Sequence, residues 1–93
     1  MRDLGSLDDD QLIEASLKGE AEAFGELYDR YVNQVFKFIY QRLGDRERAE
    51  NLTEQVFLSA WESLPENSRR NVKFSAQLIR TARNLLIDNR FSK

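Results

Sequence analysis

The stretch AEAFGELYDRYVNQVFKFIYQRL, residues 21–43, decides how this chain folds. Apolar and aromatic side chains recur along it at spacings of three and four, which is the pattern of a long amphipathic helix. Gly44 is a natural residue to end such a helix, and Gly25 inside it predicts a close approach by a neighbour, the preceding helix. A wide apolar face of this length must be covered, so the rest of the chain has to supply the elements that cover it.

Helical spacing also appears on both sides of this stretch. We expect a short helix over residues 9–18, with Asp8 as its N-cap and Gly19 just beyond its end. A further helix should run over residues 46–63 with Asp45 as its N-cap.

Pro65 determines what we expect of the second half of the chain. Because proline lacks an N–H and disfavours helical backbone in the preceding residue, the helix should stop before it, and a loop should cover residues 65–73. A last helix should then span residues 74–90. The sequence therefore predicts an all-α fold: a compact bundle of four helices, one short and three longer, in a single domain over residues 1–93.

The residue types that are absent narrow the chemistry. The chain has no cysteine and no histidine, so we expect no catalytic residues, no metal and no cofactor. Carboxylate pairs such as Glu20 with Glu22 fit solvated helix faces and do not favour an enzyme. The N-terminus has no apolar signal segment, and no apolar run approaches the ~20 residues of a membrane helix. A cytoplasmic protein without a membrane partner is the default expectation.

The net charge of −2 conceals two opposed halves. Residues 1–40 hold four cations and nine acids, whereas residues 41–93 hold ten cations and seven acids. From Arg69 onward, seven cations accompany a single acid, and most of the cations are arginines. Such asymmetry points to nucleic acid, although an ordinary solvated helix face explains the charge equally well.

Two predicted helices carry outward-facing side chains that indicate a binding partner more specifically than the net charge does. In the last helix the spacing places Arg80, Arg83, Asn84 and Ile87 on one side, flanked by Gln77 and Asp88. Arginine binds phosphate, and Arg, Asn and Gln read base edges, so this side favours nucleic acid. In the preceding helix the apolar Leu58 lies in a polar stripe with Trp61 beside it, which fits a contact with a partner protein, although Trp61 is more often a core residue.

Three blocks of the sequence carry a resemblance to a known family. They are DDQLIEASLKGEAEAFGELYDRY at 9–31, GDRERAENLTEQVFLSAWESLP at 44–65 and FSAQLIRTARNLLIDNR at 74–90. In this order and spacing they resemble region 2 of bacterial extracytoplasmic-function (ECF) sigma factors, the promoter-recognition subunits of RNA polymerase. The resemblance implies a sigma factor region 2-like bundle that binds core polymerase and recognises and melts the promoter −10 element.

The resemblance also implies a role for each block. The outward stripe of the third helix matches the family's surface for the clamp coiled coil of the largest polymerase subunit, with Asn51, Glu54, Gln55 and Leu58. The loop matches the specificity loop that receives a base flipped out of the −10 element, and the last helix matches the segment that contacts its non-template strand. The DNA-binding residues would then be Asn67, Ser68, Arg69, Arg70, Asn71, Lys73, Gln77, Arg80, Arg83, Asn84 and Asp88.

The chain departs from the family pattern at specific positions. Asn51 replaces an acid, and Glu54 and Gln55 reverse the usual pair, which removes one carboxylate from the clamp surface. Gln77 stands where a tryptophan is common, so we expect Gln77 to contact solvent or DNA and not to pack.

The resemblance also bears on partners and domains. An anti-sigma factor is a further partner that it implies. The family's second domain, a helix–turn–helix reader of the −35 element, is absent from this chain, which is then one domain of a longer protein or a free-standing domain. The alternative interpretation is a sigma-like helical module for interaction or regulation that no longer opens DNA.

Overall fold

A computed structural model describes residues 3–91 of the protein, with side chains described as far as residue 88. A 3-10 turn, η1 (Leu4–Ser6), leads into the helices α1 (Asp9–Leu17), α2 (Ala21–Leu43), α3 (Arg46–Glu62), α4 (Leu64–Arg69) and α5 (Phe74–Phe91). There is no strand in the part of the chain that the structure describes. The predicted all-α class and helical bundle are confirmed.

α4 is the helix that the sequence did not predict. The expectation of a loop over residues 65–73 is wrong for its first half, because α4 covers Leu64–Arg69. Pro65 lies in the first turn of α4. A proline is tolerated there because the N–H groups of a first turn have no acceptor within the helix. Only residues 70–73 remain as the connection to α5.

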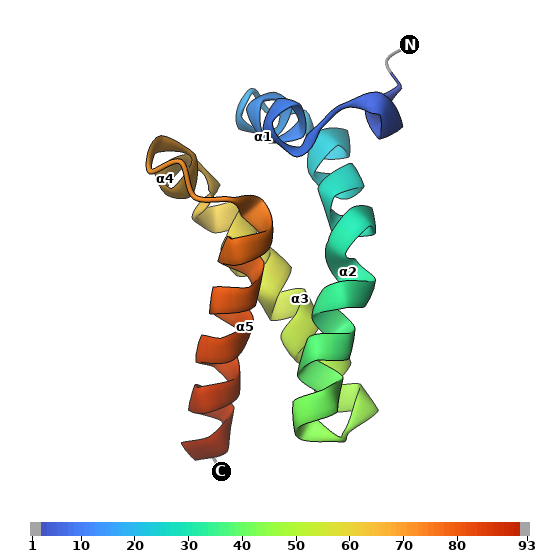
Figure 1. Cartoon of the computed structure of the whole chain (residues 1–93), viewed down its shortest axis with the longest axis vertical. Helices are drawn as coiled ribbons and strands as arrows, with labels where there is room; N and C mark the ends of the chain where they lie inside the picture. The colour runs from blue at the N-terminus through green and yellow to red at the C-terminus, as the bar shows by residue number, and fades with distance from the viewer. Residues whose placement is uncertain (1–2, 92–93) are drawn as a thin grey trace.

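α3 is the helix that joins the bundle together. It packs against both α2 and α5, and α2 also contacts α5 (Figure 1). α1 packs on the N-terminal part of α2 and contacts α4. As a result, α1, α4 and the start of α5 gather at one end of the molecule, and the C-terminal ends of α2 and α5 lie at the other (Figure 1).

The described core is one apolar cluster to which all the longer helices contribute. Its largest fully buried side chains are Leu12, Leu27, Val35, Ile39, Val56 and Leu78. Phe74, the first residue of α5, is 2% exposed, and its ring centroid lies 6.0 Å from that of Phe24 and 5.7 Å from that of Tyr31. These ring contacts fix the start of α5 against α2, and so they also place the 70–73 connection.

The predicted helix ends are present. Asp8 accepts a hydrogen bond from the Gln11 N–H at 2.8 Å, and the Gln11 side chain accepts one from the Asp8 N–H at 2.9 Å, which makes a complete capping box. Asp45 caps α3 through the Arg48 N–H at 3.2 Å. Gly44 ends α2 with a φ of 73°, a left-handed conformation that glycine adopts without strain.

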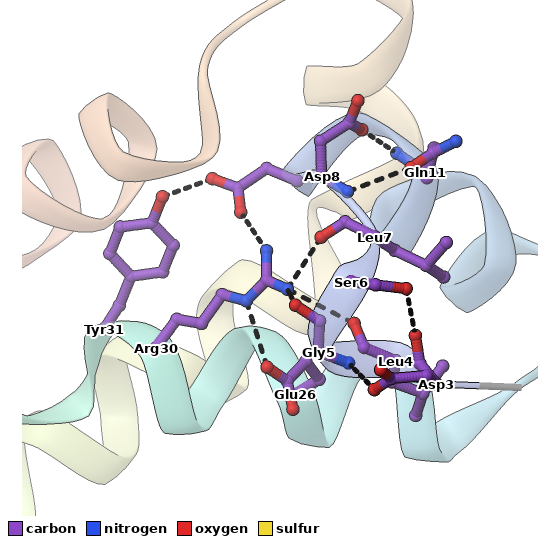
Figure 2. Close-up of polar contacts among 11 residues, drawn as sticks. Asp3, Leu4, Gly5, Ser6, Leu7, Asp8, Gln11, Glu26, Arg30 and Tyr31 are labelled. Carbon is purple, nitrogen blue, oxygen red and sulfur yellow. Dashed lines mark hydrogen bonds and ion pairs between the residues drawn. The ribbon is translucent and has the colours of Figure 1, made fainter.

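Arg30 ties the N-terminal turn and α1 to α2 (Figure 2). Its guanidinium pairs with Glu26 at 3.1 Å and with Asp9 at 3.2 Å. It also donates hydrogen bonds to three backbone carbonyls of the N-terminal segment, those of Leu4, Gly5 and Leu7. The hydrogen bond to Glu26 is the largest cause that raises the pKa of Arg30 above its ordinary value.

Tyr31 completes this network from the next position of α2. Its hydroxyl donates a hydrogen bond to the second carboxylate oxygen of Asp9 (Figure 2). Burial, followed by this hydrogen bond, raises the pKa of Tyr31 to about 12. The neutral phenol is therefore the form that the folded state stabilises.

The structure corrects the expectation for Gly25. A side-chain carbon placed there would meet no atom within 4 Å outside the local helix backbone, and the residue is exposed. No neighbour uses the space that the missing side chain leaves, so the glycine only weakens α2.

We therefore predict that Gly25→Ala raises the free energy of unfolding by about 1 kcal/mol, the usual advantage of alanine over glycine inside a helix. Urea denaturation followed by circular dichroism measures it. The matched control is Gly44→Ala, which should lose stability because its φ is positive. A loss of stability in Gly25→Ala would contradict the open surroundings of Gly25.

The pKa of Tyr31 predicts a loss of stability at alkaline pH. The phenol titrates at 10.0 in its ordinary state and at about 12 in the folded protein, so between these values the folded state keeps a proton that the unfolded state has lost. The stabilisation is therefore complete below pH 10.0 and is lost as the pH rises towards 12. Urea denaturation across this range should show a steeper fall for the wild type than for Tyr31→Phe, and equal slopes would refute the assignment.

Candidate nucleic-acid interface

The outer face of α5 carries four of the eleven expected DNA-contacting side chains. Arg80, Arg83, Asn84 and Asp88 are all exposed on it. On the opposite face, Leu78, Ala82 and Leu86 are buried in the core. The helix is therefore held by its apolar side and presents a polar face with two arginines and an asparagine to solvent.

Gln77 does not belong to that outer face. It is 5% exposed, and its side-chain amide donates hydrogen bonds to the Ala60 carbonyl at 3.2 Å and to the Ser63 hydroxyl at 3.1 Å. The expectation of a solvent or DNA contact at Gln77 is wrong. The position follows Phe74 by three residues and so lies on the same, inward side of α5, where the amide finds partners at the C-terminal end of α3.

The segment from α4 to α5 carries the other expected DNA contacts. Asn67, Ser68 and Arg69 belong to α4, and Arg70, Asn71 and Lys73 lie in the connection. All are exposed except Asn67, which is half-buried.

The backbone of the connection is tightly turned. The Val72 N–H donates to the Asn67 carbonyl at 3.0 Å, and the Asn71 N–H donates to the Ser68 carbonyl at 3.1 Å. Asn71 has a φ of 59°, a left-handed conformation that asparagine tolerates better than most residues. Lys73 follows this turn and is the last residue before α5.

Glu66 partly neutralises this segment. It pairs with Arg69 at 2.6 Å and with Arg70 at 3.3 Å, and all three side chains are more than half exposed. Exposed ion pairs contribute little to stability, so a phosphate can compete with Glu66 for either arginine at small cost.

An open cavity of about 610 Å³ lies beside this connection. One wall comes from the connection and the start of α5, with Asn71, Val72, Lys73, Phe74 and Ser75. The other wall comes from the start of α1 and from α2, with Asp8, Asp9, Asp10 and Arg30. Asp9 and Arg30 are fixed there by the network of Figure 2. Sequence reasoning did not find this second wall, because nothing in the local pattern of α1 indicates that it faces the start of α5.

The outward stripe of α3 forms a second candidate surface. Asn51, Glu54, Gln55 and Leu58 are all exposed, and Leu58 is 61% exposed. Trp61 is 40% exposed, but its ring centroid lies 4.8 Å from that of Phe24 in a T-shaped contact, so the indole is anchored on α2. The stripe therefore combines polar side chains with an unburied leucine, next to an anchored tryptophan.

A smaller cavity of about 240 Å³ adjoins this stripe at Glu54, between α2 and α3. Its walls include Tyr28, Val32, Asn33 and Phe36 from α2 and Arg46, Glu50, Thr53 and Glu54 from α3. The α2 side of this cavity was not predicted from the sequence, since only the tertiary packing brings it beside the α3 stripe.

In the described part of the chain, no group of three or more acidic side chains is placed to hold a metal ion. Within the same residues, no helix is both long and apolar enough to cross a membrane.

Comparison with known proteins gives the family of the chain. Residues 27–93 match the model of the family described as Sigma-70 region 2. The chain is 40% identical over 79 residues to the ECF RNA polymerase sigma factor BldN of Streptomyces coelicolor, and the match covers 85% of this chain and 30% of BldN. It is 34% identical over 71 residues to the ECF RNA polymerase sigma factor SigW of Bacillus subtilis, with 76% of this chain and 37% of SigW covered.

A solved structure agrees with these sequence matches. The 1.8 Å structure of the RsbN–BldN complex contains a chain that matches this fold with a TM-score of 0.77 and 41% identity, over 82% of this chain and 55% of the matched one. The present chain thus spans about a third of the length of the two curated relatives. The family model, the two relatives and the matching fold all agree, and we conclude that this chain belongs to the Sigma-70 region 2 family, as a region 2 domain of an ECF sigma factor.

Proposed function

We propose that this domain serves in transcription initiation by binding core RNA polymerase with α3 while it captures the non-template strand of an opened −10 element with α4 and α5. The observation that carries the proposal is that a member of this family exposes an arginine- and asparagine-bearing face on α5 together with a cavity at its start. The proposed role is binding and not catalysis. Polymerase and promoter as partners would place its work in the bacterial cytoplasm.

In the proposed DNA interface, different side chains of α5 contact the phosphates and the bases. Arg80 and Arg83 would contact phosphates, because both residues are exposed on one side of α5 and guanidinium groups bind phosphate. Asn84 lies beside them and is able to hydrogen-bond a base edge. Such contacts favour the open form of the promoter because they form with the separated strand, and they need no ATP hydrolysis.

The cavity at the start of α5 is the proposed receptor for a flipped base. Its volume of about 610 Å³ lies within the range of pockets that hold small ligands. Asn71 offers an amide that can pair with a base edge, and Lys73 offers a cation for the adjoining phosphate. Arg69 and Arg70 are near enough along the chain to add phosphate contacts if they release Glu66.

The polymerase half of the proposal uses the α3 stripe. Glu54 and Gln55 offer an acid and an amide to a polar partner helix, and the exposed Leu58 offers an apolar contact between polar neighbours. This is the usual composition of a protein interface, in which a few apolar side chains are surrounded by hydrogen-bonding groups. The partner we propose is the clamp coiled coil of the largest polymerase subunit.

A regulatory protein partner of the anti-sigma class is also proposed. It is supported by the similarity of this chain to BldN and to a chain in the solved RsbN–BldN complex. Such a partner would hold the domain away from polymerase until it is released.

We predict that Arg80→Ala combined with Arg83→Ala weakens binding to a fluorescent single-stranded oligonucleotide with a −10-like sequence. If each arginine neutralises one phosphate, the slope of log K against log salt should fall by about 1.4, because each contact to a single strand contributes about 0.7. The matched control is Arg46→Ala with Arg48→Ala, which removes the same charge from α3 and should bind nearly as the wild type does.

The same titration tests the alternative function. A wild-type domain that binds core polymerase but fails to bind the oligonucleotide at low salt would favour an interaction module that does not open DNA. If Arg80→Ala combined with Arg83→Ala lost oligonucleotide binding and polymerase binding to the same extent, unfolding would be the explanation and the proposed DNA surface would be rejected.

For the polymerase surface, we predict that Glu54→Ala combined with Gln55→Ala weakens binding to core RNA polymerase about tenfold, or about 1.4 kcal/mol. Both side chains are exposed, so the fold should be retained, which circular dichroism checks. Oligonucleotide binding should stay at the wild-type level. An unchanged affinity for polymerase would refute the α3 surface.

A further inference from the structure

A second open cavity lies at the opposite end of the molecule from the proposed base pocket. It has a volume of about 390 Å³ and is lined by Arg42, Leu43, Arg83, Leu86 and Ile87. These residues come from the C-terminal halves of α2 and α5, and both helices terminate on the same side of the bundle (Figure 1). We call it the α2–α5 groove.

Two arginines, one from each helix, flank this groove and approach the same aromatic ring. The guanidinium carbon of Arg42 lies 3.7 Å from the Phe38 ring centroid, and that of Arg83 lies 6.0 Å from it. Arg42 is also held in place by a hydrogen bond from its side chain to the Phe38 carbonyl at 3.0 Å. Among the residues that the structure describes, neither arginine has an ion pair with a carboxylate.

This arrangement favours an anion between the two helices. The face of Phe38 attracts each cation, but a neutral ring does not cancel their charge. A carboxylate placed between the two guanidinium groups would gain from both, because each arginine can donate more than one N–H to it.

The floor of the groove is apolar. Ile87 is 52% exposed, although its described neighbours on the outer face of α5, Arg83, Asn84 and Asp88, are polar. Leu86 is buried beside it, and Leu43 of α2 is half-buried. An exposed isoleucine that continues into a cavity with two leucines forms an apolar patch, and such patches mark contacts with other proteins more often than isolated exposed residues do.

We propose that the α2–α5 groove is a docking site for an acidic amphipathic segment of a partner protein. An apolar side chain of that segment would cover Leu43, Leu86 and Ile87, while a flanking carboxylate would lie between Arg42 and Arg83. Charge complementarity selects an acidic partner, and the apolar floor selects a protein segment over a DNA backbone, since a phosphate gains nothing from isoleucine and leucine. The site is separate from the proposed polymerase surface on α3, but a segment bound in it would cover Arg83.

Nuclear magnetic resonance of the methyl-labelled chain tests the proposal with designed helical peptides. The probe peptide carries a stripe of leucines flanked by glutamates, and two matched peptides replace either its glutamates with lysines or its leucines with serines. We expect the probe peptide to shift the methyl signals of Leu43, Leu86 and Ile87, and both matched peptides to bind at least fivefold more weakly.

Two pairs of variants locate the binding in the groove. Ile87→Ser should weaken binding of the probe peptide at least fivefold, whereas Leu17→Ser, at another exposed leucine, should leave it unchanged. Arg42→Gln should weaken binding to a similar extent, whereas Arg48→Gln should not. All four substitutions are at exposed positions, and circular dichroism verifies that each variant is folded.

Three results would overturn the proposal. The first is equal binding of the glutamate and lysine peptides, which would remove the charge argument. The second is unchanged binding by Ile87→Ser, which would place the peptide elsewhere. The third is a single-stranded oligonucleotide that shifts the methyl signals of Leu43, the α2 residue of the groove, as strongly as the probe peptide does, which would assign the groove to DNA.

Discussion

Burial of the apolar face of α2 is the constraint on which the rest of the structure depends. Most of the stability of a protein helix comes from tertiary packing of its apolar face, and in α2 Leu27, Val35 and Ile39 are buried in the core where α2 contacts α1, α3 and α5. Once α3 and α5 lie on this face, their own apolar sides point inward. Their remaining sides, which carry the candidate polymerase and DNA residues, have to face solvent.

The rotation and position of α5 are fixed near its start. The ring of Phe74 contacts the rings of Phe24 and Tyr31, and Gln77 donates two hydrogen bonds to the C-terminal end of α3. Because a helix is rigid, these contacts in its first turn determine the direction of Arg80 and Arg83 further along. A buried glutamine thus supports the candidate DNA surface without belonging to it, by holding the helix that presents it.

Much of this arrangement was predictable, and the failures have definite physical causes. The spacing of apolar residues predicted an all-α bundle, and short-range rules predicted the caps at Asp8 and Asp45, because these features depend on neighbours within one helical turn. The local pattern does not predict α4, because Pro65 indicates the end of α3 and the beginning of a loop, although proline also suits the first turn of a new helix. Gln77 and Gly25 were misassigned because burial and close approach depend on which helix lies opposite, and a local pattern does not contain that information.

The sequence by itself determined α1, α2, α3 and α5, the caps at Asp8 and Asp45, the acidic and basic halves of the chain and the exposed stripes on α3 and α5, since periodicity and charge are properties of each segment alone. Only the tertiary structure decided which segments share a site. It placed Asp9 and Arg30 across a cavity from Asn71 and Lys73, and it brought Arg42 of α2 and Arg83 of α5 to one phenylalanine ring. The physical reason is that these neighbours are far apart along the chain, and only the joint burial of one apolar core brings them together.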